Sequence, residues 1–154
     1  MRHKRAPKRT IAPDLRYQST EVAKFINYLM GGGKKNTATR VFYSAFDRIA
    51  KAGQDPLHVF DEAIKNTGPT LEVRSKRVGG ANYQIPFPVR SERRFFLAAH
   101  WIIDAAKGRK GAPMGIKLAD ELVQAAKGEG AAVKKRQDVY RMAEANKAFA
   151  HFAR

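Results

Sequence analysis

Apolar residues recur every three to four positions in three segments near the beginning of the chain, which is the spacing of a buried helix face. The segments cover residues 19–31, 36–53 and 55–68. Each begins at a residue whose side chain can cap a helix and ends at a glycine. Their short connections predict antiparallel or steeply crossed helices. The expected caps are Ser19, Asn36 and Asp55, and the expected core residues include Val22, Phe25, Ile26, Val41, Phe42, Phe46, Ile49, Phe60 and Ile64.

The period changes to two between residues 71 and 90, where apolar and polar residues alternate in two runs. The connecting residues 79–82 include two glycines, which allow positive φ angles, so the runs predict an antiparallel β-ribbon. Pro86 and Pro88 lack N–H groups on the same side of the second run, which is tolerable only at an unpaired edge. We therefore expect two strands that stand apart from any larger sheet.

Three further helices are predicted after the ribbon. The fourth, over 92–106 with Ser91 as its cap, is apolar on nearly every side, which is typical of the central helix of a domain. The fifth ends at Gly128, and the sixth, over 132–149, has few strongly apolar residues and should lie across the surface. The aromatic residues of the fourth helix expected in the core are Phe95, Phe96 and Trp101.

Length and composition limit the architecture to one ordinary domain, because the chain has 154 residues of which 44% are hydrophobic. The predicted fold class is mainly α, with about six helices in a single domain (19–154), a β-ribbon (71–90) between the third and fourth helices, and a basic N-terminal arm (1–18). The longest apolar stretch, 95–103, is far shorter than the ~20 residues that span a bilayer. The absence of cysteine excludes disulfides, thiolate metal sites and a cysteine nucleophile.

The charge is the least ordinary feature, since 30 Lys and Arg residues stand against 14 Asp and Glu, a net charge of +16. This charge is self-repelling unless a polyanion neutralises it, and nucleic acid is the first candidate. Nineteen of the 30 cations form six clusters whose only acidic member is Glu92. One cluster alone could be a solvated surface, but six together favour contacts with a phosphate backbone. They are Arg2, Lys4, Arg5, Lys8 and Arg9; Lys34 and Lys35; Arg74, Lys76 and Arg77; Arg90, Arg93 and Arg94; Lys107, Arg109 and Lys110; and Lys134, Lys135 and Arg136.

Recognition of single-stranded RNA usually adds aromatic stacking to such charge, and Tyr83, near the ribbon tip, is the best placed candidate. Packing of Tyr83 against Val78 across the ribbon is an equally open alternative.

Motifs of enzymes are absent from the sequence. Residues 31–35 (GGGKK) are not a phosphate-binding loop, because Tyr28 stands where that motif has its first glycine and Lys35 where it needs Ser or Thr. No two histidines are spaced as metal ligands. They are His3, His58, His100 and His151. We therefore expect no enzyme activity, metal, cofactor or small-molecule substrate.

Three ordered segments carry a family resemblance. The first contains STEVAKFI (19–26), Gly33-Lys34-Lys35 and VFYSA (41–45); the second is EVRSKRVGGANYQIPFPVR (72–90), and the third is AVKKRQDVYRMAEANKAFAHF (132–152). At matching separations, they resemble the family of small ribosomal subunit protein seven in its bacterial form. The resemblance extends from about Asp14 to the end of the sequence.

The resemblance implies a helical domain with a protruding ribbon that acts as a primary binder of small-subunit (16S-type) rRNA and nucleates assembly of the 3′ major (head) domain. It implies a place in the small ribosomal subunit of the cytoplasm or an organelle, near exit-site tRNA, mRNA and small-subunit proteins nine and eleven. The residues matching its rRNA-facing pattern are those of the arm, Gly33, Lys34, Lys35, Arg74, Lys76, Arg77, Arg93 and Arg94; Arg90, Lys107, Arg109 and Lys110 are added for their charge. Those matching the ribbon tip and C-terminal helix are Gly79, Gly80, Ala81, Asn82, Tyr83, Lys134, Lys135, Arg136 and Arg141.

Two other function classes remain open at this level. A nucleoid-type DNA-binding protein also combines helices with a basic β-ribbon, and it would prefer duplex DNA over folded rRNA. An RNA-modifying enzyme would have a deep pocket with shifted titratable groups.

Overall fold

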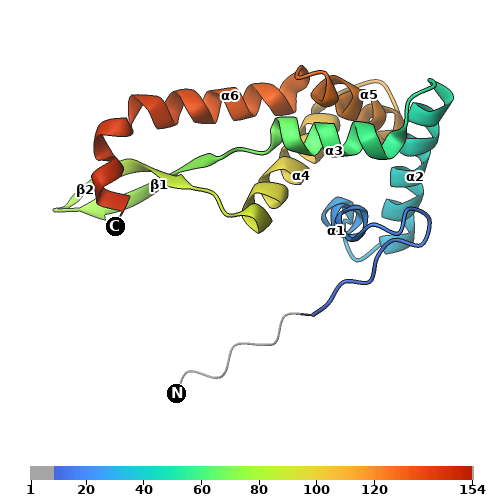
Figure 1. Ribbon diagram of the computed structural model, residues 1–154, viewed down its shortest axis with the longest axis horizontal. Coiled ribbons are helices and arrows are strands. Elements are labelled where there is room, and N and C mark those ends of the chain that lie inside the picture. Colours follow the sequence, from blue (N-terminus) through green and yellow to red (C-terminus); the bar gives the residue numbers. More distant parts are fainter. Residues whose placement is uncertain (1–8, 154) are drawn as a thin grey trace.

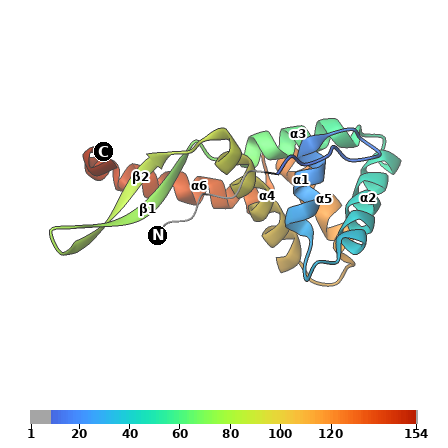
Figure 2. The same cartoon turned by 90° about the horizontal axis from the view of Figure 1, so that it is seen from below.

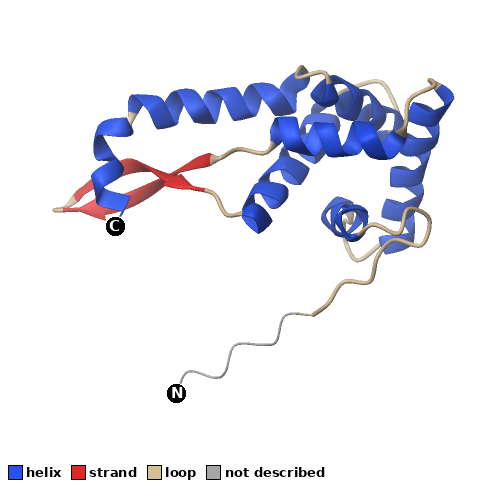
Figure 3. Cartoon of the chain, in the orientation of Figure 1, coloured by secondary structure: helices blue, strands red, loops and turns tan. Residues whose placement is uncertain are grey.

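The computed structural model describes residues 9–153 and is mostly helical, with an antiparallel two-stranded ribbon between its third and fourth helices (Figures 1 and 3). This confirms the predicted fold class. The described residues form six α-helices, two strands and one 3-10 helix: α1 (Thr20–Leu29), α2 (Lys35–Lys51), α3 (Pro56–Thr67), β1 (Leu71–Val78), β2 (Ala81–Pro88), α4 (Ser91–Gly108), α5 (Met114–Ala126), α6 (Gly130–Ala145) and η1 (Lys147–Ala153).

The first three helices begin at or close to the predicted residues. Ser19 caps α1, where its hydroxyl accepts from the N–H of Val22, the third residue of the helix, at 3.4 Å. The carboxylate of Asp55 accepts from the N–H of Leu57, the second residue of α3, at 3.2 Å. The prediction that Asn36 caps α2 is wrong, because the helix has already begun there and Lys34 is the N-cap. Gly33, with φ 74°, lets the chain turn into the helix earlier than the apolar pattern indicates.

The core centres on four phenylalanines, Phe25, Phe42, Phe46 and Phe60, all with 0% exposure. Their rings contact one another at centroid distances from 4.2 Å (Phe42 to Phe46) to 6.0 Å (Phe42 to Phe60). Helix α5 closes this core, since it packs against α2, α3, α4 and α6. The centre of the domain is therefore shared between α5 and α4, which contacts α1, α3, α5 and α6.

Helix α4 differs from the prediction at its beginning. Ser91 is its first residue, so the predicted cap is wrong and Arg90 is the N-cap. Its buried residues are Ala98, Ala99, Ile102, Ile103 and Ala106. Phe95, Phe96 and Trp101 are half-buried, which corrects their placement in the core. An apolar surface on nearly every side thus overstated how much of this helix the other helices cover.

The ribbon turns through Gly79 and Gly80 alone, whose φ angles are 58° and 89°. A two-residue turn needs such angles at both positions, which glycine supplies without a steric cost. The predicted four-residue connection is therefore too long, and its other members, Ala81 and Asn82, pair with Val78 and Arg77.

The two prolines of β2 lie as predicted on the unpaired edge. Val89 N–H donates to the Thr70 carbonyl at 2.9 Å, so alternate residues of this strand face β1. Pro86 and Pro88 have the opposite parity, and their missing N–H groups cost no hydrogen bond of the ladder.

The C-terminal part of the chain packs along the ribbon. The single helix predicted over 132–149 is divided, because α6 ends at Ala145 and η1 folds back onto β2 (Figure 1). Tyr83 contacts the rings of Phe149 and Phe152 at centroid distances of 5.0 and 5.6 Å. The ribbon tip extends past η1 in both views (Figures 1 and 2). The C-terminal aromatic residues therefore pack on the ring of Tyr83.

The segment before α1 is held against α2. Asp14, 8% exposed, accepts hydrogen bonds from the N–H groups of Arg16 and Tyr17 at 3.1 Å each and from the Tyr43 hydroxyl at 2.8 Å. Burial, together with this bond to a carboxylate, raises the pKa of Tyr43. Four of the predicted arm cations lie outside the described residues: Arg2, Lys4, Arg5 and Lys8. None of the described helices has the length and apolar character needed to span a membrane.

Candidate nucleic-acid interface

The base of the ribbon holds a buried carboxylate between two arginines. Glu72, 8% exposed, pairs through one oxygen with Arg74 of the same strand. Its other oxygen accepts from Arg93 Nε, on α4, at 3.2 Å. Each guanidinium also lies over an aromatic ring, since Arg74 is 5.6 Å from the centroid of Phe87 and Arg93 is 4.9 Å from that of Phe96. These contacts fix the direction of two exposed cations across the junction of ribbon and helix.

A depression of about 640 Å³ opens at the same place. Its wall includes Arg90, the N-cap of α4, whose exposed side chain has no hydrogen bond or ion pair with residues 9–153. The partial positive charge of a helix N-terminus adds to that of the arginines. The depression can therefore hold a phosphate group, which arginine binds in a bidentate manner. The residues that line it are Arg74, Phe87, Pro88, Val89, Arg90 and Arg93.

The outer part of the ribbon has fewer side chains available to a nucleic acid than its sequence indicates. Arg77 is exposed and has no polar contact with the described residues, so it can reach a phosphate. Lys76 donates to the Phe152 carbonyl at 2.8 Å, and Tyr83 is covered by η1. Of these three predicted contacts, Arg77 is therefore the one with neither a polar partner nor a ring contact among residues 9–153.

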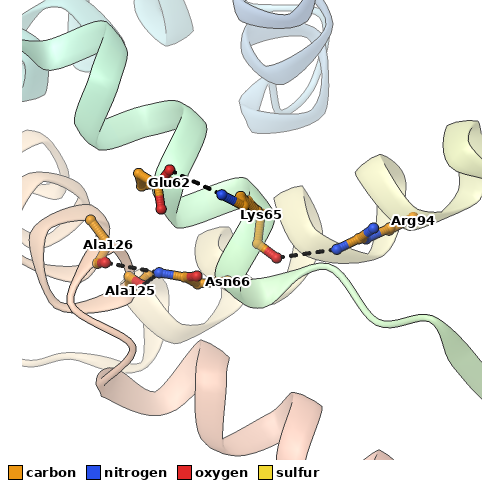
Figure 4. Close-up of polar contacts among 6 residues, drawn as sticks. All are labelled: Glu62, Lys65, Asn66, Arg94, Ala125 and Ala126. Carbon is orange, nitrogen blue, oxygen red and sulfur yellow. Dashed lines mark hydrogen bonds and ion pairs between the residues drawn. The ribbon is translucent and has the colours of Figure 1, made fainter.

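Arg94 lies away from the depression and binds the end of α3 (Figure 4). Its Nε donates to the Gly68 carbonyl at 3.1 Å and its Nη2 to the Lys65 carbonyl at 3.3 Å. A Cβ at Gly68 would lie 2.8 Å from Arg94 Nε, so only glycine admits this approach. Asn66 secures the same helix end by donating to Ala126 O at 2.8 Å. These bonds argue against the predicted contact of Arg94 with rRNA, because its guanidinium already binds two carbonyl groups at the end of α3.

Replacing Arg94 by glutamine is expected to lower the free energy of unfolding by about 1–2 kcal/mol, since a charged partner of helix C-terminal carbonyls is lost. Affinity for RNA should change little. The Arg90→Gln variant should show the reverse, with weaker RNA binding and unchanged stability. Urea unfolding and RNA titration of both variants check this, and a strong loss of RNA affinity with Arg94→Gln at full stability would contradict it.

Arg109 is also committed within the protein. Its side chain, 29% exposed, donates to the fully buried Glu121 from Nε at 3.0 Å, and its Nη2 contacts Gln124. Its neighbours Lys107 and Lys110 are exposed. Lys107 shares a small depression of about 170 Å³ with Lys34, so the fold brings two of the predicted clusters together. Gly33 and Lys35 are exposed beside them.

The basic residues of α6 are divided in the same way. Lys134, Lys135 and Arg141 are exposed, and Arg141 lies 3.8 Å from Asp138. Arg136 is half-buried, with its guanidinium 5.8 Å from the ring centroid of Tyr140. Three of these four predicted residues are thus open to a partner.

Sequence reasoning missed a second basic surface, on α2. Two depressions, of about 520 and 680 Å³, share Arg48 and Lys51 as lining residues. The first also includes Arg16 and Arg40, although Asp47 pairs with Arg16 at 2.7 Å. The helical spacing of positions 40, 48 and 51 places these cations on one face and could have revealed it.

Comparison with known proteins agrees with the family resemblance. A sequence model of ribosomal protein S7p/S5e matches residues 1–147. The small ribosomal subunit protein uS7 of Nitrosospira multiformis is 56% identical over 152 residues, which cover 98% of this chain and 97% of the relative. That of Thiobacillus denitrificans is 55% identical over the same shares, and that of Francisella tularensis subsp. holarctica is 55% identical over 98% of each chain. The chain belongs to the ribosomal protein S7p/S5e family.

Proposed function

We propose that the protein is a component of the small ribosomal subunit that binds small-subunit rRNA directly and nucleates assembly of its 3′ major domain. It acts as a structural protein without catalytic activity, in the cytoplasm. Membership of a ribosomal protein family supports this, as do relatives named for the small subunit.

The observation that carries the proposal is the Glu72 junction. A carboxylate buried at the base of the ribbon orients Arg74 and Arg93 toward a depression that also contains Arg90. Further cations lie on other elements, including Lys34 before α2 and Lys107 at the end of α4. Charge distributed over several elements suits folded RNA, which presents separate backbone segments, better than one groove of a regular duplex.

The ribbon tip and α6 are the parts that we assign to the neighbourhood of exit-site tRNA and mRNA. The tip extends past η1 (Figure 2). Lys134, Lys135 and Arg141 are exposed on α6. Small-subunit proteins nine and eleven are the proposed protein neighbours.

The salt dependence of rRNA affinity tests the proposal. Each neutralised phosphate contributes about −0.7 to −0.9 to the slope of log K against log salt concentration. Arg74, Arg77, Arg90 and Arg93 alone should therefore give a slope of about −3 or steeper. Filter binding of transcribed 3′ major domain rRNA between low and moderate salt measures it. A flat slope would contradict the proposal.

Competition at fixed salt separates RNA from DNA. Unlabelled 3′ major domain rRNA should displace the labelled complex at far lower concentration than duplex DNA of equal length. Preference for duplex DNA would instead favour a nucleoid-type protein.

A further inference from the structure

A cluster of four half-buried aromatic rings lies between α1 and α4, outside the phenylalanine core. Tyr28 of α1 contacts three rings of α4: Phe95 at 6.3 Å, Phe96 at 5.4 Å and His100 at 5.0 Å between centroids. All four residues keep part of their surface exposed. The cluster is thus an aromatic surface that the other helices do not cover completely.

Contacts behind the cluster hold its rings in place. His100 stacks on Phe96 at 4.0 Å, and its Nδ1 lies 2.9 Å from the Phe96 carbonyl. The Arg93 guanidinium, held by Glu72, lies over Phe96 as well. The orientation of Tyr28, which meets Phe96 edge to face at 84°, is therefore supported from α4.

A depression of about 580 Å³ adjoins the cluster and is lined by Tyr28 and Phe95. Two cations, Arg9 and Lys24, one carboxylate, Glu92, and the hydroxyl-bearing Thr20 line it too. Its volume is within the range of small-molecule sites. Aromatic faces beside cations are the combination that binds unpaired nucleotides, since the rings stack on the base and the cations bind the phosphate.

We propose that this depression holds an unpaired base of the bound RNA, stacked against Tyr28 and Phe95, with its phosphate near Arg9 and Lys24. This inference rests on the proposed RNA-binding function and adds to it a site for a single unstacked nucleotide. The charge argues for a nucleotide over an apolar peptide, because the two cations outnumber the one carboxylate in the lining and leave it net positive. Tyr28 and Phe95 are positioned to contact the base, whereas Phe96 and His100 position Tyr28.

The first test compares the rRNA affinity of Tyr28→Leu with that of the wild type. Leucine keeps an apolar side chain but removes the flat ring. Affinity should fall about 5- to 150-fold at every salt concentration, the value of one stacked base. The slope against salt should stay that of the wild type, because no phosphate contact is lost. Lys24→Gln should instead make the slope shallower by about 0.7–0.9. Tyr17→Leu, a half-buried tyrosine against Phe46, is the matched control and should bind like the wild type.

The second test uses the wild-type complex, so it does not depend on the folding of any variant. Ultraviolet irradiation joins stacked bases to aromatic rings, and trypsin would release residues 25–34 with Tyr28 and residues 95–107 with Phe95. We expect an RNA adduct on one of these peptides by mass spectrometry.

The outcomes separate the inference from the function. Steep, salt-dependent binding by the wild type with unchanged affinity of a folded Tyr28→Leu, or with adducts only on other peptides, overturns the nucleotide site alone. Failure of the wild type to bind rRNA overturns both.

Discussion

Replacing Glu121 by alanine is expected to lower the free energy of unfolding by about 3–5 kcal/mol. Glu121 is 0% exposed and joins three elements, since its carboxylate on α5 pairs with Arg109 after α4 and accepts from Ala132 N–H of α6 at 3.0 Å. Alanine would leave a partly buried guanidinium unneutralised and a buried N–H unpaired. Urea unfolding followed by circular dichroism measures the loss.

Two matched variants show whether the charge pair is the cause. In an Arg109→Met background, replacing Glu121 by leucine should cost much less than Glu121→Ala costs in the wild type, because no charge is left alone. Glu62→Gln, which breaks an exposed pair with Lys65 at 3.4 Å, should change stability by less than about 1 kcal/mol. A similar loss of stability in Glu121→Ala and Glu62→Gln would contradict the role of burial.

Replacing Arg77 and Arg90 together by glutamine is expected to weaken rRNA binding about 100-fold or more, since each arginine can give one charged hydrogen bond to phosphate worth about 1.5–3 kcal/mol. The salt slope should become shallower by about 1.4–1.8. Stability should be unchanged, because neither side chain has a polar partner among residues 9–153. Titration of 3′ major domain rRNA at several salt concentrations measures both quantities.

The control for this pair is Lys65→Gln with Lys147→Gln, which removes the same charge from exposed positions on α3 and η1. It should weaken binding far less at physiological salt. Equal weakening by both pairs would mean that net charge governs binding, and the ribbon junction would lose its special role.

Much of the fold could be predicted because its signals are local. The caps Ser19 and Asp55, the glycines of the ribbon turn and the parity of Pro86 and Pro88 each act within a few residues. The predicted helix boundaries are wrong where residues outside the apolar pattern determine them. Gly33 moved the start of α2, and the contact of η1 with β2 ended α6 early.

The candidate site was less accessible to prediction, because equal charges serve different purposes in the fold. Arg93 and Arg94 are adjacent in sequence, yet one faces the depression and the other binds the carbonyls of α3. Arg109 is bound by Glu121 of α5, twelve positions away, and is therefore not available to a nucleic acid. The sequence predicts Phe95 and Phe96 of the aromatic cluster in the core, because a helical pattern does not show how much of a helix the other elements cover.

The cover of Tyr83 by Phe149 and Phe152 also has a consequence for the timing of biosynthesis. Sixty-six positions separate Tyr83 from Phe149. At about 5–20 residues per second, the ribbon is made roughly 3–13 s before the aromatic residues that pack on it. During this interval, the Tyr83 ring of the nascent chain is not covered, and the ribbon completes its packing only when Phe149 and Phe152 have left the translating ribosome.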